Sequence, residues 1–139
     1  VTGEPYRLKS KLRSLSWEHL GILRDSQGLD CVEQELNLIE SELNNLPMPN
    51  HRGGNPDLQE RLDAENLIDV ARLIAAAAKL REESRGSHFR EDFPESDDRY
   101  LVNFYQRRET DGSMTTESRP VDFTRRTPDV LLGETLIPT

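Results

Sequence analysis

The feature that most constrains the fold is a run of apolar residues spaced alternately three and four positions apart between residues 29 and 46. These residues are Leu29, Val32, Leu36, Ile39, Leu43 and Leu46. This spacing places all of the side chains on one stripe of an α-helix, because the helix repeats every ~3.6 residues. Pro47 and Pro49 follow directly, and proline cannot continue the hydrogen-bond ladder of a helix. The segment therefore predicts an amphipathic helix that buries one face.

A first helix is expected before this one, from Pro5 to about Leu20, where leucines recur at near-helical spacing. Gly21 would loosen the end of that helix, and the segment 24–28 is predicted to be a turn. An amphipathic helix must cover its apolar stripe, so the first two helices are expected to pack on each other.

A third helix is expected from Pro56 to about Arg85. Asn55 is a good N-cap residue, Pro56 suits the first helical position, and Gly86 is well placed as the C-terminal stop. The residues expected to form most of its apolar face are Leu58, Leu62, Leu67, Val70, Ile74 and Ala77. A stretch of four alanines from Ala75 to Ala78 would favour the helix and permit a close approach to its neighbours.

Three such helices predict a mainly α domain, a three-helix bundle that resembles a spectrin repeat and occupies residues 1–95. An extended segment and a β-hairpin are expected to follow within residues 96–139. Alternating residues predict a strand over 100–105, and Asp111-Gly112 is a good hairpin turn before a return strand over 114–123. The residues from Thr124 onward are expected to form an arm.

Composition excludes several classes of protein. Lys and Arg number 18 against 26 Asp and Glu, and the formal net charge of −8 disfavours binding to nucleic acid. No apolar run is long enough for a membrane span. Cys31 is the only cysteine, so neither an internal disulfide nor a thiolate zinc site is expected. Cys31 itself is expected to be a small residue at the edge of the core. A reducing, cytoplasmic location is the expectation.

The densest polar cluster runs from Glu82 to Pro94 and combines two arginines, a histidine and four acids. One interpretation is an anion site, in which Arg85 and Arg90 grip a carboxylate bidentately and His88 donates or transfers a proton. The other is a structural clamp. In that case Arg85 satisfies carbonyls at the helix end and pairs with a carboxylate, while Gly86 supplies the reversing turn. The spacing alone favours the clamp.

The remaining charged and metal-binding residue types show no pattern of a site. His19 and His51 are expected to be surface or core-edge residues, and Asp97-Asp98 is expected to be a solvated or capping pair. Two arginine pairs are expected to lie on a surface that contacts another protein or solvent, namely Arg107-Arg108 and Arg125-Arg126. The histidines are far apart, so no metal site is expected. The sequence also lacks a glycine-rich dinucleotide fingerprint, a phosphate-cradling lysine loop and a nucleophile elbow, so the chain has no obvious means to bind a large cofactor alone.

The segment Arg81–Pro94 closely resembles the signature of a C-terminal domain found in L-aspartate oxidase, fumarate reductase and succinate dehydrogenase flavoproteins. The matching positions are Glu83, Ser84, Arg85, Gly86, His88, Arg90, Asp92 and Pro94. The segment Trp17–Arg24 resembles the first-helix segment of that family, and the alanine-rich third helix leads into the motif in the same way. The resemblance covers residues 12–94 well and the hairpin, to Val121, less closely.

The resemblance implies that the parent protein is an FAD-dependent oxidoreductase acting on L-aspartate or on succinate and fumarate. Its FAD-binding and capping domains would precede this helical domain and would hold the catalytic arginine and histidine residues. Those domains would be the partners of this chain, which alone would bind no FAD and turn nothing over. The resemblance therefore implies no catalytic or cofactor-binding residue in this chain. The eight matching residues are carried over only as the family motif, with an expected role in contact with the flavin domain.

The choice of branch depends on smaller features. Trp17 and the spacing from Gly21 to Leu29 lean toward L-aspartate oxidase, which converts aspartate to iminoaspartate for NAD biosynthesis. The segment Arg119-Pro120-Val121 leans toward fumarate reductase and succinate dehydrogenase. We favour L-aspartate oxidase and keep the other branch as the alternative. Two hypotheses of other classes remain, a stand-alone protein-interaction module and a small-molecule binder built on the arginines and the histidine of the motif.

Overall fold

A computed structural model describes residues 3–50, 53–111 and 113–124 of the chain. Three helices and a small antiparallel hairpin make up most of these residues, which confirms the mainly α class. The chain forms two compact units, residues 1–97 and residues 98–139. His51, Gly112 and the pair Arg125-Arg126 lie outside the described residues, as does the expected arm beyond Thr124.

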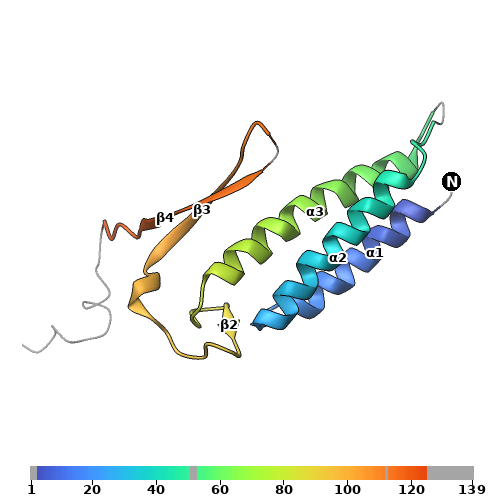
Figure 1. Ribbon diagram of the computed structural model, residues 1–139. Helices are drawn as coiled ribbons and strands as arrows, with labels where there is room; N and C mark the ends of the chain where they lie inside the picture. Colours follow the sequence, from blue (N-terminus) through green and yellow to red (C-terminus); the bar gives the residue numbers. More distant parts are fainter. Residues whose placement is uncertain (1–2, 51–52, 112, 125–139) are drawn as a thin grey trace, which may run out of the picture. The chain divides into compact units, whose positions relative to one another are not determined.

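The first unit is a bundle of three helices, α1 (Glu4–His19), α2 (Ser26–Asn45) and α3 (Pro56–Leu80). The helices run side by side, and α3 extends beyond the other two (Figure 1). Asn55 caps α3 as predicted, because its side chain accepts a hydrogen bond from the backbone N–H of Leu58 over 3.1 Å. The predicted bundle is confirmed.

The apolar stripe of α2 lies in the core, as its spacing predicts. Its buried members are Leu29, Val32, Leu36, Ile39 and Leu43, and Leu46 is partly buried against them. The helix begins at Ser26, so most of the turn predicted over 24–28 is in fact its first turn. The physical reason is the N-cap, because the Asp25 carboxylate accepts a hydrogen bond of 2.6 Å from the Gly28 N–H.

The buried face of α3 is not the one that its large apolar residues predict. Four of the residues predicted to face the core are exposed: Leu62, Leu67, Val70 and Ile74. The other two, Leu58 and Ala77, are of intermediate burial. The apolar residues that α3 does bury are mostly small: Ala64, Ile68, Ala71, Ala75 and Ala78. Small side chains let the α3 backbone approach α1 and α2 closely, and this close packing decides which stripe turns inward.

A pair of matched substitutions distinguishes the two stripes of α3. Ala71→Leu should destabilise the bundle by about 1–3 kcal/mol, because extra methyl groups would be forced into a closely packed core. Val70→Leu adds volume to the exposed stripe and should change stability by less than about 0.5 kcal/mol. Urea unfolding monitored by circular dichroism measures both. Equal effects of the two substitutions would contradict the assignment of the core face.

The end of α3 also differs from the prediction. The helix stops at Leu80 rather than near Arg85, because Arg81 leaves the helical conformation with φ −91° and ψ 95°. Gly86 therefore does not act as the helix stop and serves a later turn. The chain then forms a short strand, β2 (Phe89–Arg90), parallel to β1 (Leu23–Arg24) in the loop that joins α1 to α2.

The described part of the second unit contains a 3-10 turn, η1 (Asp98–Tyr100), and the antiparallel strands β3 (Val102–Arg108) and β4 (Met114–Pro120). The predicted hairpin is confirmed, although its first strand begins at Val102 because Tyr100 belongs to the 3-10 turn. The carboxylate of Asp111 accepts a hydrogen bond of 2.9 Å from the Ser113 N–H, which stabilises the turn.

Candidate functional site

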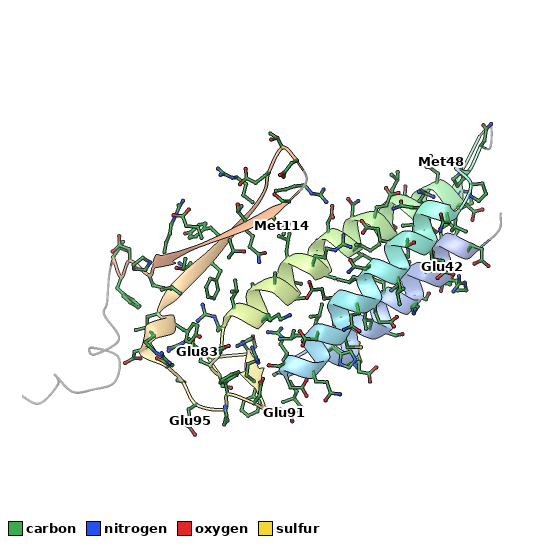
Figure 2. The ribbon with its side chains drawn as sticks, viewed as in Figure 1. Glu42, Met48, Glu83, Glu91, Glu95 and Met114 are labelled. Carbon is green, nitrogen blue, oxygen red and sulfur yellow. The ribbon has the colours of Figure 1, made fainter. Side chains whose placement is uncertain are left out.

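The family motif, residues 83–94, folds into two tight turns that follow the end of α3. Figure 2 labels Glu83 where the chain leaves the helix, and Glu91 and Glu95 farther along the loop. Isolated bridges close the two turns, one between Arg85 and His88 and the other between Arg90 and Phe93. The loop thus brings together side chains that belong to the helix end and to both turns.

Gly86 and Ser84 set the path of this loop. Gly86 has φ +59°, a left-handed conformation that glycine adopts without the steric cost met by other residues. Ser84 is buried and joins the turns, because its Oγ accepts from the Arg90 N–H and donates to the Phe93 carbonyl, each over 2.9 Å. The small residues of the motif therefore position its charged ones.

Arg90 is the centre of the cluster, with 1% of its surface exposed. Its Nε and one terminal nitrogen donate bidentately to the Asp92 carboxylate, each over 2.8 Å. The other terminal nitrogen donates to the carbonyls of Ala78 at 2.9 Å and Arg81 at 3.2 Å. Carbonyls at the end of a helix lack partners within the helix, and the C-terminal end of a helix attracts cations. Arg90, rather than the predicted Arg85, therefore satisfies the end of α3.

Asp92 extends this contact to α2. Its Oδ2 accepts hydrogen bonds from the backbone N–H of Ser26 at 3.0 Å and from the Ser26 hydroxyl at 2.6 Å. Ser26 is the first residue of α2, and the N-terminal end of a helix attracts anions. The ion pair of Arg90 and Asp92 thus places its cation at the end of α3 and its anion at the start of α2, which joins the two helices.

Glu83 forms a second buried ion cluster and has no exposed surface. Its carboxylate accepts two hydrogen bonds of 3.0 Å from Arg85 and one of 2.6 Å from Arg81. It also accepts one of 2.8 Å from the backbone N–H of Asp97. Burial alone would raise the pKa of Glu83, but these hydrogen bonds outweigh it and lower the pKa below its ordinary value. Glu83 is therefore held as a carboxylate.

Both ring nitrogens of His88 form hydrogen bonds with residues of the first unit. Its Nε2 lies 3.1 Å from the Arg81 carbonyl and its Nδ1 lies 2.6 Å from a guanidinium nitrogen of Arg24. A carbonyl only accepts and a guanidinium only donates, so the ring carries its proton on Nε2. Burial lowers the pKa of His88, and the neighbouring arginines Arg24 and Arg90 lower it further. His88 is a neutral bridge between the motif and the loop that precedes α2.

These shifts predict that the first unit loses stability in acid. The pKa values of His88, Glu83 and Asp92 are all lower in the folded chain than their ordinary values. The unfolded chain then binds more protons, so the free energy of unfolding should fall as pH falls. The fall should begin near pH ~6.5 through His88 and continue below about pH 4.5 through the carboxylates.

Urea unfolding at a series of pH values between 7 and 3 measures this dependence. His88→Gln should flatten the upper part of the curve and leave the lower part, because glutamine does not titrate and its amide can still donate to the Arg81 carbonyl. A free energy of unfolding that is constant from pH 7 to pH 5 in the unsubstituted chain would contradict the assigned state of His88.

The arrangement favours the clamp interpretation over an anion site. Arg85 and Arg90 do grip carboxylates bidentately, but the carboxylates are those of Glu83 and Asp92 in the same chain. The residues also do not form a cradle for the diphosphate of FAD. Such a cradle needs cations or backbone N–H groups that face a concave space, whereas the backbone N–H groups of Arg90 and Asp97 donate to Ser84 and Glu83. No chemical step is therefore assigned to this motif.

Several residues of the cluster lie far from the motif in the sequence, and sequence reasoning missed them. Arg24 precedes His88 by 64 positions and Ser26 precedes Arg90 by 64, and parallel pairing of β1 with β2 brings them together. The only sequence signal was the family resemblance of the segment that ends at Arg24. Arg61 was also missed. It is buried beside α2 and donates to the Leu43 carbonyl over 2.8 Å.

The next two findings, on metal sites and on membrane-spanning helices, apply only to the residues that the structure describes. Over residues 3–50, 53–111 and 113–124 there is no group of three or more His, Cys, Asp or Glu side chains that could hold a metal ion. None of the helices in those ranges has the length and apolar character that crossing a membrane requires.

A family model described as the fumarate reductase flavoprotein C-terminal region matches residues 9–130 of the chain. Among curated relatives, a fumarate reductase (CoM/CoB) protein of Methanothermobacter marburgensis is 36% identical over 92 residues. The match covers 66% of this chain and 17% of that protein. The chloroplastic L-aspartate oxidase of Oryza sativa subsp. japonica is 36% identical over 88 residues, covering 62% of this chain and 13% of the relative.

The fold is found in a solved structure of quinol fumarate reductase from E. coli. The TM-score is 0.76 and the sequence identity is 26%, and the match covers 86% of this chain and 22% of that one. The chain thus spans less than a quarter of the length of these relatives. The match to the family model and these names support the fumarate reductase branch better than the L-aspartate oxidase branch, which Trp17 and the Gly21–Leu29 spacing had favoured.

Proposed function

The chain belongs to the fumarate reductase flavoprotein C-terminal family, and from this premise we propose that it is the helical C-terminal domain of an FAD-dependent fumarate reductase or succinate dehydrogenase flavoprotein. The observation that carries the proposal is the family match over residues 9–130, which includes the entire motif. In this function the flavin and the dicarboxylate bind to the remaining part of the flavoprotein, and the present chain packs on that part.

The ion pairs within the motif support the proposal that the substrate binds to the remaining part of the flavoprotein. Its arginines are paired with Glu83 and Asp92, so a dicarboxylate substrate would have to displace internal carboxylates to bind there. Separating Arg85 from Glu83 would leave a fully buried carboxylate without this partner, which typically costs about 3–5 kcal/mol. A role in holding the bundle together therefore fits the motif better than a role in substrate binding. Contact with the flavin-binding part remains the proposed role of the exposed positions, among them Gly86 and Pro94.

Assays of the complete flavoprotein that contains this segment test the proposal. The purified protein should show the absorbance bands of an oxidised flavin, and it should oxidise a reduced dye when fumarate is added or reduce an oxidised dye when succinate is added. A purified, folded protein without flavin absorbance would contradict the assignment to a flavoprotein. The cellular location proposed for it is the cytoplasm.

The second candidate is L-aspartate oxidase, supported by the similarity to the rice enzyme and by Trp17 in the first-helix segment. The same preparation separates the two candidates. Production of iminoaspartate from L-aspartate, without oxidation of succinate, would favour the second. A stand-alone interaction module, the candidate of another class, would be supported only by a natural gene that encodes these residues alone.

A further inference from the structure

Helix α3 carries an exposed apolar stripe that the core does not use. Leu67, Val70 and Ile74 are spaced by three and then four residues, so they share one face of the helix. Each of them exposes between 37% and 49% of its surface. Apolar residues scattered singly on a surface are ordinary, whereas a continuous stripe of them is not.

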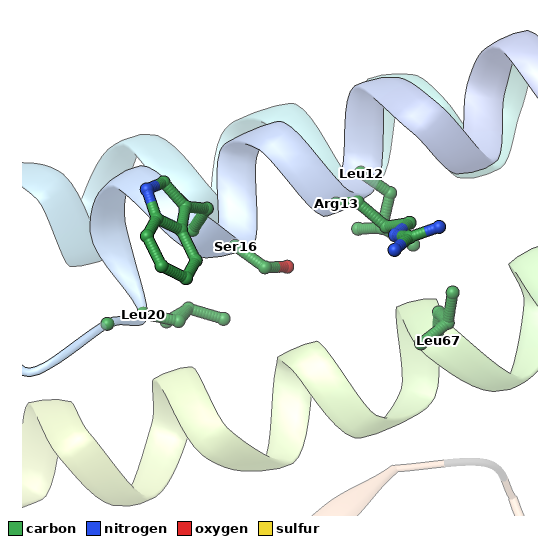
Figure 3. Close-up of a pocket in the computed structure, with 7 residues that line it drawn as sticks. Leu12, Arg13, Ser16, Leu20 and Leu67 are labelled. Carbon is green, nitrogen blue, oxygen red and sulfur yellow. The ribbon is translucent and has the colours of Figure 1, made fainter.

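Trp17 of α1 extends this stripe. The tryptophan is 87% exposed, and it lines a pocket of about 360 Å³ together with Leu67 across the groove between the helices. Figure 3 shows Leu12, Arg13 and Ser16 on the α1 side of this pocket and Leu67 on the α3 side. We name the surface formed by Trp17, Leu67, Val70 and Ile74 the Trp17 face.

The composition of the Trp17 face is typical of a protein interface. Tryptophan and arginine are enriched among the residues that contribute most to binding between proteins, and Arg13 lies beside Trp17 in the pocket. The outward side of α2 differs. Its one exposed large apolar residue, Leu38, has the polar neighbours Asn37 and Ser41. The bundle therefore has one side suited to a partner and another suited to water.

We propose that the Trp17 face is the surface on which the flavin-binding part of the same flavoprotein packs, with Trp17 as its anchor. This inference rests on the proposed function. Most of a related flavoprotein lies outside the region that matches this chain, so a large body of protein is there to cover the face. A second copy fits less well, because two chains that each carry a net charge of −8 repel one another.

Oxidation of Trp17 in the complete flavoprotein tests the inference. Trp17 is the only tryptophan of this segment, and cleavage after Arg13 and Arg24 isolates it in one peptide that mass spectrometry can follow. With N-bromosuccinimide, Trp17 should react at least about tenfold more slowly than free N-acetyltryptophanamide, because the centre of an interface excludes solvent. Reaction at nearly the same rate as the free amide would overturn the inference.

Substitutions then identify what protects Trp17. Val70→Asp and Ile74→Asp should restore its oxidation and speed the proteolytic release of the segment, because each buries a charge in the contact. Leu38→Asp is the control, since it places the same charge on the outward side of α2 and should change neither rate. If the two substitutions in the Trp17 face behaved like the control, the inference would be wrong.

Two further results separate this inference from its rivals and from the proposed function. Protection of Trp17 that disappears on dilution, as a dimer dissociates, would assign the face to a second copy and overturn the inference. Flavin absorbance together with a freely reactive Trp17 would leave the flavoprotein assignment standing and remove the packing surface. Absence of flavin would remove the proposed function, and with it the partner that the inference names.

Discussion

Arg90→Met should reduce the free energy of unfolding of the bundle by about 3–5 kcal/mol, because the buried Arg90 donates to one carboxylate and to carbonyls at the end of α3 that would lose this donor. Methionine keeps most of the apolar bulk of arginine but donates no hydrogen bond. The Asp92 carboxylate and the Ala78 and Arg81 carbonyls at the end of α3 would each lose a donor. Urea unfolding monitored by circular dichroism gives the difference directly.

The control for this substitution is Arg7→Met. Arg7 also pairs with two carboxylates, those of Glu4 and Glu42, but its side chain is 50% exposed. Surface ion pairs contribute about 0–1 kcal/mol, so the control should have a small effect. If Arg90→Met were as mild as Arg7→Met, Arg90 would not be holding the end of α3.

Glu83→Gln should also destabilise the bundle strongly, by about 3 kcal/mol or more. The amide has nearly the shape of the carboxylate, so the change removes charge and one acceptor without leaving a cavity. The amide nitrogen would face a guanidinium, and Arg81 and Arg85 would lose the carboxylate that they share. Thermal and urea unfolding measure the loss.

Glu42→Gln provides the matched control, because Glu42 contacts Arg7 at a surface where its side chain is 45% exposed. This control should alter stability by less than about 1 kcal/mol. A Glu83→Gln chain as stable as the control would show that the buried carboxylate is not needed, and the clamp would then reduce to the contacts of Arg90.

The sequence was sufficient to predict that three helices and a hairpin form, because apolar residues are spaced differently in a helix and in a strand. The stripe of α2 has a single apolar face and was assigned correctly. In α3, two apolar stripes share the same spacing, and periodicity cannot choose between them. The stripe that contains Ala71 is buried because small residues allow close packing, whereas Ile74 belongs to the exposed stripe.

The site was predictable in its residues but not in its contacts. The resemblance identified the motif, and the clamp interpretation expected an arginine at the helix end. Which arginine reaches back depends on two tight turns, so the structure assigns Arg90 to α3 and Arg85 to Glu83. The contacts with Arg24 and Ser26 require the pairing of β1 with β2, which no local pattern encodes.

The charged residues of the motif bind one another, so they should not bind a dicarboxylate from solution. Calorimetric titration of fumarate into the purified 139-residue chain tests this most directly. No saturable heat is expected, because Glu83 and Asp92 already occupy Arg85 and Arg90. A saturable heat of binding that is lost on substitution of Arg85 by alanine would contradict it.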